Sequence, residues 1–191
     1  MMESCPYKRE HIITMPEGGK EQPHYLLHCL IHAQLAEYIH HLFGINIFLP
    51  GEDEHLQKKA DWVMSVANDW FVNARIHKLA PEEEIKAVNR LITKKMPIYQ
   101  NNWEILPKEL QVDCFFILAR HRRIGMKPDI HVSGLTQLMR DVFLAVDPLP
   151  PTIENLESLI NSLLPYVGCP SVERVVGHEV EVWKFVKRKR K

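Results

Sequence analysis

The 191-residue sequence is 46% hydrophobic and 25% charged, a composition that predicts one folded domain over residues 1–191 and excludes a disordered chain. Lysine plus arginine and aspartate plus glutamate number 24 each, so no net field attracts nucleic acid or an anionic membrane surface. The four cysteines lie far apart without a CxxC pair, which argues against a disulfide framework and against a cysteine-based zinc site.

No targeting or membrane segment is expected. The sequence contains no run of 18 apolar residues, and its N-terminus lacks the apolar core of a signal peptide. We therefore expect a cytoplasmic protein that does not cross a membrane. Prolines and glycines in residues 1–20 predict an irregular lead-in, and residues 187–191 (KRKRK) form a basic tail.

The predicted elements are mainly helices, so the expected fold class is all-α with at most a small β element near the C-terminus. Apolar residues, Leu30 among them, recur at helical spacing between Pro23 and Gly44. A second long helix is expected from about residue 54 to residue 78, and its apolar face includes Trp62.

Prolines and capping residues divide the rest of the chain. Pro81 and three glutamates begin a third helix, which Pro97 should end. Ser133 and Thr152 are suited to cap two later helices. The expected segments after the second helix are helices at residues 82–95, 108–123, 134–146 and 153–164 and a strand-like stretch at 177–187.

Histidine is concentrated near the start of the first long helix. His24, His28 and His32 are spaced i, i+4, i+8, so on a helix they lie along one face. Two imidazoles one turn apart can bind the same metal ion, which is why this spacing is found in helical zinc sites. The competing interpretation is a partly exposed histidine face that binds no metal.

A zinc site of the catalytic type has three protein ligands and an open position for water, so a third ligand must come from elsewhere. The second helix carries Asp69, Asn73 and His77 at the same i, i+4, i+8 spacing, and two antiparallel helices would set this face opposite the histidines. The Asp69 carboxylate, next to Trp70, would be costly to bury unless it is paired or bound to metal. Alternatively, Asp69 lies on a solvated flank of the helix.

The run AlaAsnAspTrpPheValAsn at residues 67–73 resembles the A-x-D-[YW]-x-[VI]-N signature of a family of bacterial zinc metallopeptidase-like domains that often precede a von Willebrand factor A-like domain. In that family a HExxH helix comes first, and the aspartate-bearing helix follows a few tens of residues later. Residues 22–78 have a similar order and spacing of these two helices.

The resemblance implies that His28 and His32 are the helical zinc ligands, that Asp69 is the third ligand, and that Asn73 fixes their geometry. The pair His24 and His28 is equally well spaced, so the residues themselves leave the choice of pair open.

One position departs from the family pattern. The family's general base is the glutamate directly after the first histidine, whereas this sequence has Cys29 after His28 and Tyr25 after His24. Neither is a good base for a zinc-bound water, and loss of a positioned base commonly costs about 10²–10⁴ in rate. Glu37 lies two turns from His28 on a different azimuth.

The sequence therefore predicts a metallopeptidase-like zinc-binding helical protein with one zinc ion at His28, His32 and Asp69 and with His24 as a further candidate ligand. Hydrolysis of a protein or peptide substrate stays open, and no catalytic residue is assigned. One alternative is a non-enzymatic helical module that binds another protein without metal. A second alternative is a nucleic-acid accessory protein that acts through residues 187–191.

Overall fold

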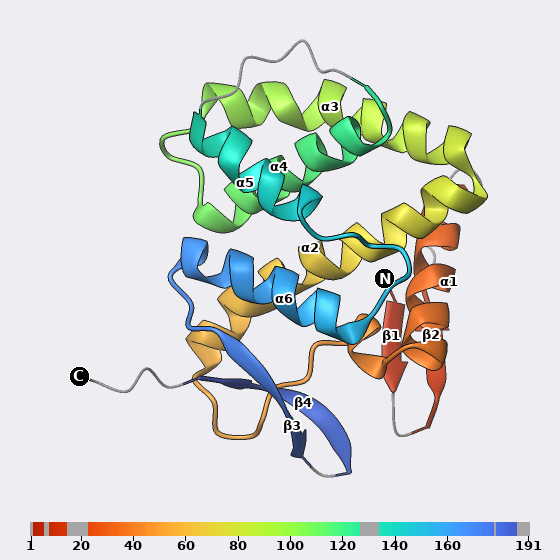
Figure 1. Cartoon of the computed structure of the whole chain (residues 1–191), viewed down its shortest axis with the longest axis vertical. Coiled ribbons are helices and arrows are strands. Elements are labelled where there is room, and N and C mark those ends of the chain that lie inside the picture. The colour runs from red at the N-terminus through yellow and green to blue at the C-terminus, as the bar shows by residue number, and fades with distance from the viewer. Residues whose placement is uncertain (1, 6–7, 15–22, 127–133, 178, 187–191) are drawn as a thin grey trace.

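The computed structural model describes residues 2–5, 8–14, 23–126, 134–177 and 179–186. Within these ranges the chain forms six α-helices, two short 3₁₀ helices and two antiparallel hairpins, which confirms a mainly helical fold (Figure 1). The helices are α1 (Pro23–Tyr38), η1 (His41–Phe43), α2 (Glu54–Leu79), α3 (Pro81–Asn101), α4 (Lys108–Arg123), α5 (Gly134–Leu144), α6 (Ile153–Leu163) and η2 (Leu164–Val167). The strands are β1 (Met2–Cys5), β2 (Glu10–Ile13), β3 (Val172–Gly177) and β4 (Val180–Phe185).

Helix α2 is the central element. It packs against α1, α3, α4 and α6, and Figure 1 shows it crossing the molecule with α3, α4 and α5 toward one end and the β3–β4 hairpin toward the other. Val63, Trp70 and Ile76 of α2 are buried in the main hydrophobic core. The Trp70 ring packs edge-on against Phe143 of α5, with 5.7 Å between ring centroids. This burial, worth roughly 2–3 kcal/mol for such a side chain, fixes the rotation of α2 and hence the direction of Asp69.

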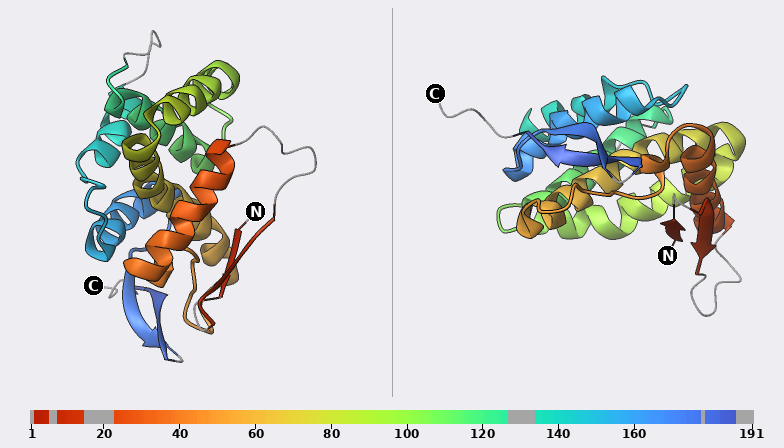
Figure 2. Two further views of the ribbon diagram at one scale, coloured as in Figure 1. Left: turned by 90° about the vertical axis from the view of Figure 1, so that its right-hand side faces the viewer. Right: turned by 90° about the horizontal axis from the view of Figure 1, so that it is seen from below.

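Helix α1 lies with the β1–β2 hairpin at one edge of the molecule (Figure 2). It ends at Tyr38, before the predicted end at Gly44, because His40 adopts an extended backbone conformation with φ −165° and ψ 136°. The chain then forms η1. This turn brings the backbone of Phe43 back to α1, where its carbonyl group contacts His32.

Two helix starts have side-chain caps. The Asp53 carboxylate accepts hydrogen bonds from the backbone N–H groups of His55 and Leu56 at 2.8 and 2.9 Å, which begins α2 at the predicted place. The predicted cap Thr152 is confirmed, since its hydroxyl accepts from the backbone N–H of Asn155 at 3.2 Å. Each cap contributes about 1 kcal/mol. Ser133, the other predicted cap, lies outside the described residues.

The prediction that Pro97 ends the third helix was wrong. Helix α3 continues to Asn101 with Pro97 inside it. Proline removes one backbone hydrogen bond, but Met96 and Tyr99 on either side are buried against α4, where the Tyr99 hydroxyl donates to the Asp113 carboxylate at 2.5 Å. Tertiary packing therefore holds a last turn that the local sequence disfavours.

The prediction of an irregular lead-in over residues 1–20 was wrong for the described part of this segment. There β1 and β2 form a hairpin with Ser4 opposite His11. The His11 ring contacts the Glu37 carboxylate of α1 at 3.1 Å, which attaches this hairpin to the first helix. The consecutive isoleucines Ile12 and Ile13 of β2 favour a strand, and the contact with α1 adds to the pairing.

The strand predicted near the C-terminus is present as β4, and it pairs with β3, which the sequence did not predict. Trp183 of β4 is buried, and its backbone also pairs with the connector before α2 through Ile47 and Leu49, at 2.8 Å each. The basic tail at 187–191 lies outside the described residues.

Leu30 and Trp62 are among the predicted core positions that are exposed instead. Leu30 lies on the outer side of α1, and Trp62 is near the surface, where its indole N–H donates to the Glu109 carbonyl at 3.1 Å. Both belong to helices whose apolar stripe is wider than the surface they cover. Within the described ranges, no helix combines the length and the apolar character that a bilayer-spanning segment needs.

Candidate metal centre

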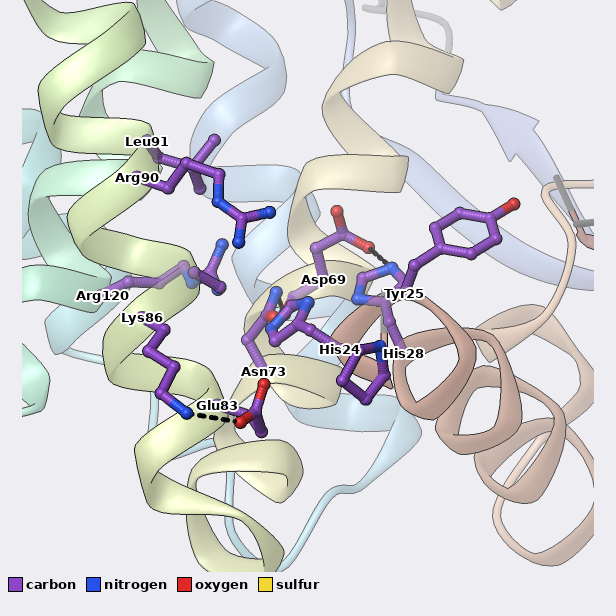
Figure 3. A pocket seen from close by; sticks show the side chains of 12 residues that line it. His24, Tyr25, His28, Asp69, Asn73, Glu83, Lys86, Arg90, Leu91 and Arg120 are labelled. Carbon is purple, nitrogen blue, oxygen red and sulfur yellow. Dashed lines mark hydrogen bonds and ion pairs between the residues drawn. The ribbon is translucent and has the colours of Figure 1, made fainter. Parts of the chain in front are cut away.

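Three side chains from two helices meet at one point. His28 and His32 lie one turn apart on α1, and Asp69 reaches them from α2. The Asp69 Oδ1 atom lies 3.2 Å from His28 Nε2 and 3.0 Å from His32 Nε2, and the two Nε2 atoms are 3.1 Å apart. Figure 3 shows the Asp69 carboxylate directed at the His28 ring. Helical spacing on α1 and the packing of α1 on α2 together produce this triangle.

The two ring nitrogens of His32 have different partners. Its Nδ1 lies 2.8 Å from the carbonyl oxygen of Phe43. Because a carbonyl can only accept, this nitrogen must carry the proton. In the neutral ring the lone pair is then on Nε2, the nitrogen that faces His28 and Asp69. A backbone carbonyl in this position is a common way to orient a metal-binding histidine.

With its proton on Nδ1, neutral His32 presents an acceptor at Nε2 to the Asp69 carboxylate, so their 3.0 Å contact needs a proton or a metal cation between the two atoms. Burial lowers the pKa of His32, but the hydrogen bond and the charge of Asp69 outweigh it, and the pKa is raised overall. For Asp69, burial raises the carboxyl pKa, whereas His28 and His32 lower it by more, so the pKa lies far below its ordinary value. Protons on the imidazoles satisfy this requirement in the chain alone, and a metal cation could replace them.

The donor atoms suit a zinc ion. Tetrahedral zinc with nitrogen and oxygen ligands at about 2.0–2.1 Å places neighbouring ligand atoms about 3.3 Å apart, and the three observed separations of 3.0–3.2 Å are close to that spacing. Two imidazoles and one carboxylate favour zinc or a similar transition metal over calcium or magnesium, which prefer oxygen ligands. Three protein ligands are the number found in open, catalytic-type sites.

Two cavities border the cluster. One, of about 320 Å³, is lined by His28 and Asp69 together with residues of α3 and α4 (Figure 3). The other, of about 340 Å³, is lined by His28, His32 and Asp69 together with Asp61 and Asn68 of α2. The Asp69 and His28 side chains are 32% and 22% exposed. A ligand from solution can therefore reach the cluster.

His24 lies beside the cluster but belongs to another group. Its Nε2 contacts the Glu84 carboxylate of α3 at 3.0 Å, and its ring centroid lies 6.3 Å from that of His28. Glu84 is buried, and Arg120 of α4 donates two hydrogen bonds to it at 2.9 and 2.8 Å. Of the two histidine pairs that the spacing allowed, the structure brings His28 and His32 to Asp69.

Other residues singled out from the sequence are placed differently. Asn73 donates from its side chain to the backbone carbonyl of Asp69 at 2.8 Å, so it bonds the main chain of α2 rather than the carboxylate. His77 lines a separate small cavity with Glu84. Cys29, where the resembling family has its glutamate, is 3% exposed, and burial raises the pKa of its thiol.

Sequence reasoning missed the partners that complete this region. The Phe43 carbonyl is a backbone group, so no side-chain pattern could reveal it. The Glu84–Arg120 pair joins positions 36 residues apart in the sequence. From the sequence alone, Glu84 is interpreted as an acidic residue that stabilises the first turn of a helix. Arg90, which lines the first cavity from α3, carries no spacing signal toward the histidines.

Comparisons with family models, curated proteins and solved structures found no match for this chain. The resemblance of residues 22–78 to metallopeptidase-like domains therefore stays a prediction, and the functional argument rests on the geometry of His28, His32 and Asp69.

Proposed function

We propose that this protein is a metallopeptidase-like zinc-binding protein that holds one zinc ion through His28, His32 and Asp69. The observation that carries the proposal is the environment of His32. Its Nδ1 is committed to the Phe43 carbonyl, while its Nε2 lies within 3.1 Å of two other potential ligand atoms. A purely structural histidine needs only one such partner for its second nitrogen.

Each residue has a separate role in this proposal. His28 and His32 supply neutral nitrogen ligands, and the Asp69 carboxylate offsets part of the ion's charge. The Phe43 carbonyl orients the His32 ring. When bound, zinc acts as a Lewis acid and lowers the pKa of a coordinated water to about 7. The cavities beside the cluster leave space for that water and for a further ligand.

The site favours metal binding over rapid peptide hydrolysis. A buried thiol, Cys29, occupies the position of the family's general base. Apart from Asp69, the carboxylate that lines the first cavity is Glu83, and Lys86 already donates to it at 2.9 Å. Asp61, which lines the second cavity, accepts a hydrogen bond from the Asn46 side chain at 2.9 Å. Glu37 pairs with Arg9 and His11, away from both cavities. We therefore expect any hydrolysis to be slower than that of an enzyme with a positioned glutamate by about 10²–10⁴.

Zinc content tests the proposal directly. The protein is loaded with zinc, freed of excess metal by gel filtration and analysed by plasma mass spectrometry. About one zinc per chain is expected. His28→Ala, His32→Ala and Asp69→Ala should each lose most of it, whereas His55→Ala, which removes an exposed histidine of α2, should keep it.

Circular dichroism shows whether each variant is folded, so that loss of zinc is not confused with loss of structure. A folded wild-type chain without stoichiometric zinc, or zinc retained by all three ligand variants, contradicts the proposal.

A further inference from the structure

The cavity of about 320 Å³ beside the proposed zinc ligands contains three cationic side chains, and two of them are already paired. Lys86 donates to Glu83 of its own helix at 2.9 Å. Arg120 is buried and donates twice to Glu84. These pairs neutralise their charges locally, which leaves Arg90 as the remaining cation of the cavity wall.

Arg90 forms no hydrogen bond or ion pair with any other residue that the structure describes. Its guanidinium projects from α3 toward the side of the cavity where α1 and α2 carry His28 and Asp69 (Figure 3). A guanidinium presents its N–H groups in a planar fork that matches a carboxylate in a two-point contact. Arg90 is itself exposed, so the direction of its side chain places an anion-recognising group at the solvent-facing mouth of the cavity.

The rest of the cavity wall suits a hydrocarbon body. Its apolar and aromatic lining comes from the start of α1 and from α3, namely Pro23, Tyr25, Ala87 and Leu91. Its volume lies at the lower end of the range of about 300–1,000 Å³ for small-molecule pockets. The occupant is therefore small, and a polymer of any length would have to lie mostly outside.

We propose that this cavity binds a small carboxylic acid with an apolar body, whose carboxylate pairs with Arg90. One unpaired guanidinium balances a single negative charge, whereas a phosphate monoester carries about −1.5 to −2 at neutral pH. The opposite end of the ligand then faces His28 and Asp69. Only that placement beside the metal rests on the proposed zinc function; the pairing with Arg90 does not.

Isothermal titration calorimetry with benzoate tests the inference on both zinc-loaded and metal-free protein. Benzoate should bind, and benzamide, which has the same shape without the charge, should bind at least about tenfold more weakly. Arg90→Ala should weaken benzoate binding by a similar factor in both metal states. Lys94→Ala removes the same charge from an exposed position one turn along α3 and should leave benzoate binding unchanged.

The two proposals fail separately in this design. If the protein binds no zinc, the metal-free titrations still decide the role of Arg90. Absence of benzoate binding, equal binding of benzamide, or benzoate affinity that is the same in Arg90→Ala and in the wild type overturns the inference. Zinc content of the Arg90→Ala protein, measured in parallel, shows whether a loss of affinity comes from a damaged metal site.

Discussion

His32 is held at both ring nitrogens, and this separates it from the other histidines of α1. The Phe43 carbonyl fixes the proton on Nδ1, and Nε2 faces His28 and Asp69. Among the described residues, His24 hydrogen-bonds to one side chain, the Glu84 carboxylate, which is itself held by Arg120. Three histidines with identical spacing thus have unequal environments.

This inequality predicts the effect of removing single imidazoles. His24→Ala should leave the zinc affinity nearly unchanged because the Glu84–Arg120 pair remains. His32→Ala should weaken it by more than about 100-fold, since loss of a residue that merely orients a ligand costs 10–100-fold. Competition with a chromophoric chelator measures both affinities. A larger loss in His24→Ala than in His32→Ala would assign the metal to the pair His24 and His28 instead.

At the scale of elements, Glu84 connects three helices. It lies on α3 and accepts from Arg120 of α4, and it contacts His24 of α1. Both members of the ion pair are buried, with side chains 2% and 6% exposed. Burial raises the pKa of Glu84, but His24 and Arg120 lower it by more, so the pKa in the folded protein is below its ordinary value of 4.5.

A carboxyl with a lowered pKa stabilises the fold above its unfolded pKa, and this contribution is lost as pH falls through the folded pKa. Glu84→Gln should therefore lower the free energy of unfolding by about 3–5 kcal/mol at pH 7, because it leaves the Arg120 charge buried and unpaired. The difference from the wild type should begin to shrink as the pH falls below about 4.5, where the unfolded chain takes up the proton, and should disappear as the pH falls through the lower pKa of Glu84 in the folded protein. Urea unfolding at pH 7 and pH 3.5 measures both values.

The neighbouring Glu83→Gln is the matched control for this experiment. Glu83 lies on the same helix and pairs with Lys86 near the surface, where water and salt screen an ion pair so that it contributes little to stability. If both glutamine variants lose the same stability, or if the loss in Glu84→Gln does not depend on pH, the buried pair does not stabilise the junction of the three helices.

At the scale of the whole molecule, the proposed metal joins an edge helix to the central one. Helix α1 packs on α2 and α3, while α2 contacts most of the remaining helices. An ion bound to His28, His32 and Asp69 binds only the folded state, because the ligands come from two helices. Zinc binding should therefore stabilise the complete fold.

Free zinc at about 100 times its dissociation constant contributes about 2.7 kcal/mol, which for a chain of this size raises Tm by roughly 5–11 °C. Thermal unfolding followed by circular dichroism measures the shift, and addition of EDTA should reverse it. Asp69→Asn should keep the fold but show little or no shift. A zinc-induced increase in Tm of the same size in that variant would place the metal elsewhere.

The local pattern of residues was sufficient to predict most of the helices and the candidate ligands. Apolar periodicity and the prolines at positions 23 and 81 located α1, α2 and α3, and the Thr152 cap located α6, because helix formation depends on contacts within one or two turns. The same short-range geometry placed His28 and His32 on one face and made Asp69 of the next helix a candidate partner.

Tertiary structure decided the rest, because the groups involved are far apart in the chain or have no side-chain signal. The Phe43 carbonyl reaches His32 only because η1 turns back on α1, and Glu84 meets both His24 and Arg120 only where three helices converge. The continuation of α3 through Pro97 depends on packing that outweighs local preference. Spacing along a helix therefore determined which side chains could share a metal, and the packing of helices against one another decided which of them meet.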